Sequence, residues 1–161
     1  MAATPGRTTI KAAVDEFVDK LRTNLTADPP TTTKPFWRVS VGQGGESDFA
    51  RPFLSFRLTS AKAVGVIDGD KIMECSATLK VVTDVIADDP FGAMLDKIGA
   101  LEDYLDSIVD TGVIDGADGF DRRVWTFDQP RATSGARLAS ASATQTFVVK
   151  VQRNQNRVPA A

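Results

Sequence analysis

Residues 71–86 read KIMECSATLKVVTDVI, and polarity alternates along the whole stretch. One side carries mostly apolar or small side chains: Met73, Cys75, Ala77, Leu79, Val81 and Val85. The other side is polar at most positions: Glu74, Ser76, Thr78, Lys80 and Asp84. Because successive side chains of a β-strand point to opposite faces, the pattern predicts a long strand with one buried and one solvated face. Such a strand is typical of an antiparallel sheet.

Further strand candidates lie on both sides of this stretch. FLSFRL at 53–58 places alternate apolar side chains on one face, and AKAVGVI at 61–67 leads into Asp-Gly, a dipeptide typical of hairpin turns. FWRVSV at 36–41 is another candidate, which we interpret as joined to 53–58 by a flexible loop. RRVWTFD at 122–128 and the alternating RLASASATQTFVVKV at 137–151 follow. The chain is therefore expected to build most of one antiparallel sheet.

Two stretches have helical periodicity instead, at residues 9–25 and at about 90–110. Asp89 can cap the second helix with Pro90 at its first position, and Gly112 offers a stop. The first apolar stripe contains Ile10, Ala13, Val14, Phe17, Val18, Leu21 and Leu25. The second contains Phe91, Met94, Leu95, Ile98, Leu101, Leu105, Ile108 and Val109. The predicted fold is a single α+β domain over 1–151, a mostly antiparallel sheet packed with two amphipathic helices, followed by a polar tail at 152–161.

Composition removes most enzyme chemistries. The chain has 161 residues, no histidine and one cysteine. It therefore has no Ser-His-Asp triad, Cys-His dyad or histidine-ligated zinc, and no internal disulfide. Cys75 lies in phase with apolar neighbours, so we expect a small core residue, and we expect Trp37 and Trp125 in the core as well. We assign no catalytic, metal-ligating or cofactor-binding residue, and we expect no membrane span because no apolar run is long enough.

The glycine-rich stretch VGQGGESDFARPF, at 41–53, superficially looks like a phosphate loop. A P-loop ends in Gly-Lys-Ser/Thr before a helix, and this stretch has neither that lysine nor a following helical pattern. As a dinucleotide fingerprint it places Ser47 at the third glycine position. We therefore interpret it as a mobile connector between strands, able to dock on a partner.

Charge is segregated along the chain although the net charge is only −2. Residues 1–65 carry +3, residues 66–118 carry −10 and residues 119–161 carry +5. The candidate acidic contact residues are Asp96, Glu102, Asp103 and Asp106. The candidate basic residues, which could face a neighbouring subunit or DNA phosphates, are Arg122, Arg123, Arg131, Arg137 and Arg153. In a ring, the acidic segment of one subunit would meet the basic segment of the next.

The order of elements resembles that of tail terminator and tail completion proteins of long-tailed bacteriophages. The stretches that carry the resemblance are IKAAVDEFVDKLRTNL, PFLSFRL, KIMECSATLKVVTDVIADDPFGAMLDKIGALEDYLDSI and ATQTFVVKV. The resemblance covers most of residues 9–151 and rests on element order, with no invariant motif. It implies a virion protein of the tail or neck, assembled in the bacterial host cytoplasm, without cofactor or enzymatic activity.

In such a family the subunit forms a ring, expected to be a hexamer, on the end of the tail tube. The ring stops tube polymerisation, offers a surface to the head connector or neck protein, and lets DNA pass through. The partners implied are other copies of the chain, the tail tube protein and the connector, with non-specific DNA contact possible. Two alternatives stay open: another tail or neck component, such as a tube subunit or connector adaptor, and a small-ligand module or enzyme that uses carboxylates and lysines.

Overall fold

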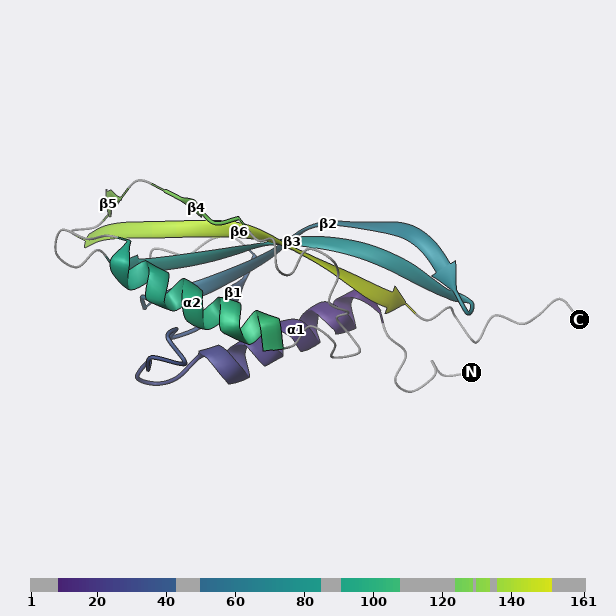
Figure 1. Cartoon of the computed structure of the whole chain (residues 1–161), viewed down its shortest axis with the longest axis horizontal. Coiled ribbons are helices and arrows are strands. Elements are labelled where there is room, and N and C mark those ends of the chain that lie inside the picture. The colour runs from purple at the N-terminus through teal and green to yellow at the C-terminus, as the bar shows by residue number, and fades with distance from the viewer. Residues whose placement is uncertain are drawn as a thin grey trace, which may run out of the picture.

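Two helices lie against one face of a long twisted β-sheet in the computed structural model of the chain (Figure 1). The structure describes residues 9–42, 50–84, 91–107, 124–128, 130–133 and 136–151. The predicted α+β class, with a mostly antiparallel sheet and two helices in a single domain, is confirmed. The two helices and the sheet enclose the core between them.

Helix α1 spans Ile10–Leu25, in agreement with the predicted 9–25. Thr9 is the N-cap, and its hydroxyl accepts a hydrogen bond of 3.0 Å from the backbone N–H of Ala12. The helix ends where Thr26 becomes extended. Five positions of the predicted apolar stripe are buried: Ala13, Phe17, Val18, Leu21 and Leu25. Periodicity alone therefore located both the helix and its buried face.

Strands β2, Phe53–Ile67, and β3, Asp70–Asp84, form the central hairpin. Asp68 and Gly69 make its two-residue turn with φ of 53° and 83°, as a type I′ turn requires. The two strands expected at 53–58 and 61–67 are one continuous strand, so the predicted break was wrong. Register shifts lie between Leu58 and Ser60 and between Ala63 and Gly65, where single-residue bulges bend β2 without ending it.

The strand order is β1–β2–β3–β6–β4, and β5 also pairs with β6. Strand β1, Val39–Val41, is shorter than the predicted 36–41 and runs parallel to β2. Strand β6, Ala136–Val151, is antiparallel to β3 along its length. Strands β4, Thr126–Phe127, and β5, Arg131–Thr133, pair with successive parts of the other edge of β6. Among the strands of the described residues, only β1 runs parallel to its neighbour.

Helix α2, Gly92–Ser107, lies within the predicted 90–110 and packs beside α1. Met94, Ile98, Leu101 and Leu105 are buried as expected. Leu95, which was expected in the apolar stripe, is exposed, so that assignment was wrong. The predicted cap at Asp89 and Pro90, the stop at Gly112, and the stripe positions Ile108 and Val109 lie outside the described residues.

The core lies between the helices and the alternating face of the sheet. On this face of β3, the side chains of Cys75, Ala77, Leu79 and Val81 are buried. Phe17 of α1 packs edge-on against Phe56 of β2, with ring centroids 5.6 Å apart, and stacks on Phe147 of β6 at 5.9 Å. Alternation in the sequence therefore identified the face that the helices cover.

The opposite face of the sheet is less solvated than the sequence predicts. Glu74, Ser76, Thr78, Lys80 and Asp84 are all only partly exposed. Phe53, Val82 and Leu138, which share this face by register, are buried. The named side chains are polar as predicted, but the face is less exposed than expected, above all near Val82 at the end of β3.

Candidate functional site

The acidic candidates all lie on α2, and three of them face solvent. Asp96, Asp103 and Asp106 are exposed. Glu102 is partly buried, and its Oε1 accepts a hydrogen bond of 2.9 Å from the indole Nε1 of Trp125. This bond ties the segment before β4 to the helix. Glu102 is therefore engaged within the subunit, and the side chains of the other three acidic candidates lie at the surface.

The structure describes two of the five basic candidates, and they lie close together. Arg131 in β5 pairs in register with Leu138, and the exposed Arg137 in β6 pairs with Ala132. Both arginines therefore belong to the short β5–β6 hairpin. Arg122, Arg123 and Arg153 lie outside the described residues, as does most of the 41–53 glycine-rich connector.

A three-stranded ribbon, which we call the arm, continues the sheet toward the β2–β3 turn, and its helix-facing side still contributes Cys75 and Phe147 to the core. It consists of residues 57–67 of β2, 70–78 of β3 and 144–151 of β6. Figure 1 shows its hairpin tip projecting beyond both helices. Strand β1 pairs with β2 only from Leu54 to Phe56, and β4 pairs with β6 only at 141–142. Within the described residues, both edges of the arm therefore pair with no further strand.

The arm also carries exposed apolar side chains that the sequence analysis did not single out. Val64, Val66 and Ile67 expose 52%, 56% and 54% of their surface, and every residue of β2 from Arg57 onward is exposed. The sequence did contain a signal for this exposure, because the apolar run AKAVGVI lies directly before the turn. Side chains at the tip of a two-stranded hairpin have little core to cover them. Apolar side chains gathered beside an open strand edge are typical of a contact surface.

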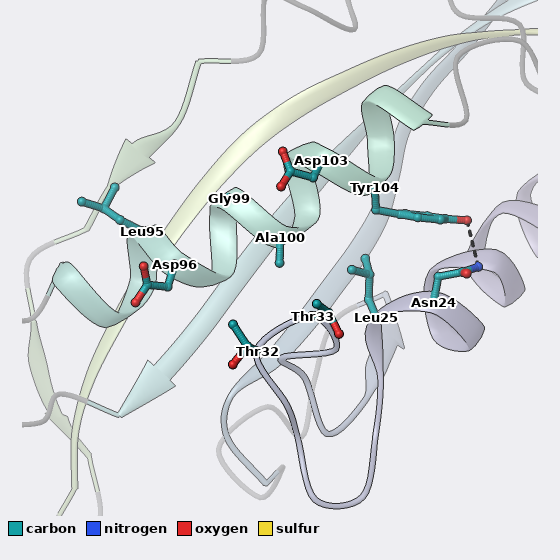
Figure 2. Close-up of a pocket in the computed structure, with 10 residues that line it drawn as sticks. All are labelled: Asn24, Leu25, Thr32, Thr33, Leu95, Asp96, Gly99, Ala100, Asp103 and Tyr104. Atoms are coloured by element: carbon teal, nitrogen blue, oxygen red, sulfur yellow. Dashed lines mark hydrogen bonds between the residues drawn. The ribbon is translucent and has the colours of Figure 1, made fainter.

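A groove of about 660 Å³ lies between α2 and the connection from α1 to β1 (Figure 2). Asp96, Gly99, Ala100 and Asp103 line its α2 side at spacings of three and four, so they share one helix face. The connection contributes two threonines, and Leu25 and Asn24 close the α1 side. A second hollow of about 450 Å³ shares Thr32 and Asp96 with it and adds prolines and Lys97, so the groove continues along α2.

The chain's one tyrosine forms one end of the groove. Figure 2 shows Tyr104 reaching from α2 toward Asn24 of α1, whose amide Nδ2 lies 3.2 Å from the phenolic oxygen. Burial raises the pKa of Tyr104, and the hydrogen bond from Asn24 opposes that rise. The groove thus combines apolar walls, threonine hydroxyls and two exposed carboxylates. The sequence pattern gave no sign of this groove, because no feature of residues 26–35 was assigned a role.

The aromatic and thiol assignments have mixed outcomes. Cys75 is fully buried as expected, and desolvation raises the pKa of its thiol, which Glu74 reinforces. Trp125 is partly buried and packs against the core. Trp37, which was expected in the core, is 39% exposed, so that assignment was wrong. It lies in a bend just before β1, where its backbone N–H donates to the carbonyl of Pro52.

Within the described ranges, no group of three or more Cys, Asp or Glu side chains is placed to hold a metal ion. Over the same residues, no helix has both the length and the apolar character required to cross a bilayer. The chain matches no model of a known protein family and no curated protein sequence.

Proposed function

We propose that this protein is a virion structural subunit that forms a ring at the end of a bacteriophage tail tube. In this role it ends tube polymerisation and joins the tail to the head or neck, and DNA passes through the ring. The observation that carries the proposal is the arm, because its two open edges belong to different strands. The resemblance in element order supplies the biological setting.

Open edges on different strands favour head-to-tail association. If the β6 edge of one copy contacts the β2 edge of the next, the same contact repeats around the assembly, and a suitable rotation closes it into a ring. Strand β6 pairs with β3 without a register shift, so its free edge is regular, whereas two bulges interrupt β2. Bulges restrict uncontrolled edge pairing, which suits an assembly that stops at a defined size.

The charge distribution supports the same geometry. Asp96, Asp103 and Asp106 are exposed on α2, and Arg137 is exposed on the β5–β6 hairpin. Exposed groups of opposite sign on different elements of one subunit favour a contact in which the next copy presents the other sign. The contact is then screened by salt, because these groups lie at the surface.

The alternative within the same class is another tail or neck component, such as a tube subunit or a connector adaptor. It would use the same arm and differ in where polymerisation stops. A tube subunit extends into long fibres, whereas a terminator stops after one ring.

Light scattering on the purified full-length protein, with negative-stain imaging of the same sample and of a mixture with tail tubes, tests the proposal. We expect a discrete ring, formed alone or on tube ends. Long tubes would show that the protein is a tube subunit and would overturn the terminator role. A protein that stays monomeric at all concentrations and ignores tube ends would overturn the proposal.

A further inference from the structure

The groove beside α2 has a composition suited to a basic, partly apolar peptide. Its two carboxylates, Asp96 and Asp103, stand about two helical turns apart on one face, with only Gly99 and Ala100 between them on that face. A Cβ built on Gly99 meets no atom within 4 Å, so the hollow here is real space and not a closely packed seam. Leu95 is exposed at the same wall.

The chain itself contains a segment of matching chemistry. Residues 152–161, QRNQNRVPAA, carry two arginines and no acidic residue, followed by a Val-Pro pair. Two cations spaced along an extended peptide match two carboxylates spaced along a helix, and the Val-Pro pair matches the apolar wall. This segment follows directly on β6, the last strand of the arm.

The geometry of the sheet prevents a subunit from placing these arginines in its own groove. Val151 lies in register with Lys71, near the hairpin turn. The groove lies near β1, which pairs with Leu54–Phe56 of β2, and these pair with Leu79–Val81 of β3. Ten strand residues separate positions 71 and 81, so the two ends are about 33 Å apart along the sheet.

The arginines follow β6 too closely for that path. About ten fully extended residues are needed to cover it. Arg157, six residues beyond Val151, would stop after about 20 Å. The matching segment must therefore come from another molecule.

We infer that the groove between α2 and residues 26–35 binds the C-terminal segment 152–161 of a second copy of the chain. The inference rests on the self-association of the proposed function and names the segment that reaches between neighbours. The arm tip of one copy then carries the tail to the helical face of the next. Charge pairing orients the tail, and the small residues Gly99 and Ala100 let it lie close to the helix.

A labelled peptide of residues 152–161 tests the inference by fluorescence anisotropy. The receptor is the full-length chain with Arg153→Glu and Arg157→Glu, so that its own tails do not compete. We expect saturable binding that weakens about tenfold or more when Asp103→Arg is added, because an attraction becomes a repulsion at short range. Asp106→Arg, on the same helix but outside the groove lining, is the matched control and is expected to change binding less than about twofold.

Two further controls separate recognition from plain charge attraction. Gly99→Leu fills the groove without adding charge and improves helix propensity, so it is expected to abolish binding in a folded protein. A peptide with the reversed sequence has the same charge and is expected to bind at least about tenfold more weakly, since its apolar pair then precedes the arginines. Equal binding of both peptides, no binding at all, or equal effects of Asp103→Arg and Asp106→Arg would each overturn the inference.

The mass of the wild-type protein, measured on the same preparations, separates this inference from the proposed function. A ring whose subunits do not bind the peptide would overturn only the tail contact. Peptide binding by a protein that stays monomeric would overturn the ring, and with it the second copy as occupant.

Discussion

Replacing Val64, Val66 and Ile67 with threonine is expected to weaken self-association while leaving the fold intact. All three side chains lie at the arm tip with about half of their surface exposed. Threonine is also β-branched, so the strand keeps its conformational preference. The substitutions therefore change the chemistry of the proposed contact surface more than its shape.

The magnitude follows from the exposed fractions. Full burial of a side chain of this size contributes about 1.5–3 kcal/mol, so burying the exposed half contributes about 0.8–1.5 kcal/mol at each position. Loss of most of that contribution at three positions weakens each intersubunit contact by about 2–4 kcal/mol. The dissociation constant should then rise about 30-fold to 1000-fold. The folded subunit should lose less than about 0.5 kcal/mol per substitution, because these side chains have little core contact.

The assay is sedimentation or light scattering across a concentration series, paired with guanidinium unfolding of the same variants. Val66→Thr and Val41→Thr form a matched pair, since both valines expose 56% of their surface and only Val66 belongs to the arm. We expect Val66→Thr to shift the association and Val41→Thr to leave it unchanged. Equal shifts for the two, or an unchanged association of the triple variant, would refute the role of the arm.

Three predictions concern the subunit itself. Phe17→Ala should destabilise the fold by about 3–5 kcal/mol in denaturant unfolding, because it empties the contact with Phe56 and Phe147; a loss below about 1 kcal/mol would contradict the packing described. Gly69→Ala should cost about 1–2 kcal/mol at φ of 83°, and Gly69→Asn should cost less, so the reverse ranking by thermal unfolding would argue against the turn. Burial raises the pKa of Cys75 in the folded protein, so the thiol ionises first in the unfolded chain, and the free energy of unfolding should fall as pH rises above about 8.5. Cys75→Ala should remove this contribution to the slope of unfolding free energy against pH. Identical slopes for the wild type and the variant would show that the thiol is not buried.

Local patterns in the sequence were enough to predict the elements. The helical period of residues 10–25 reports which side of α1 is apolar, and the two-residue period of 71–84 does the same for β3. The Asp-Gly turn was also predictable, because few residues tolerate positive φ at two successive positions. The exposed carboxylates of α2 followed from the same helical period, so part of the candidate site was accessible from sequence.

Other features depend on which distant segments meet. Nothing local distinguishes a parallel from an antiparallel partner for the three residues of β1, since periodicity assigns faces and not neighbours. Trp37 and Leu95 have apolar side chains and are still exposed, because no element among the described residues covers either one completely. Glu102 was grouped with the contact carboxylates, yet Trp125 holds it within the subunit.

The sequence by itself determined the α+β class, both helices, the central hairpin and the segregation of charge, because each depends on spacings of a few residues. Only the tertiary structure decided that β2 extends beyond its pairing with β1, which leaves an arm with two open edges. It also decided that residues 26–35 lie at a distance from α2 that leaves a groove. Open strand edges and grooves lie where distant segments, once packed, leave backbone or side chains uncovered. They depend on the relative lengths and positions of elements far apart in the chain, which no local period encodes.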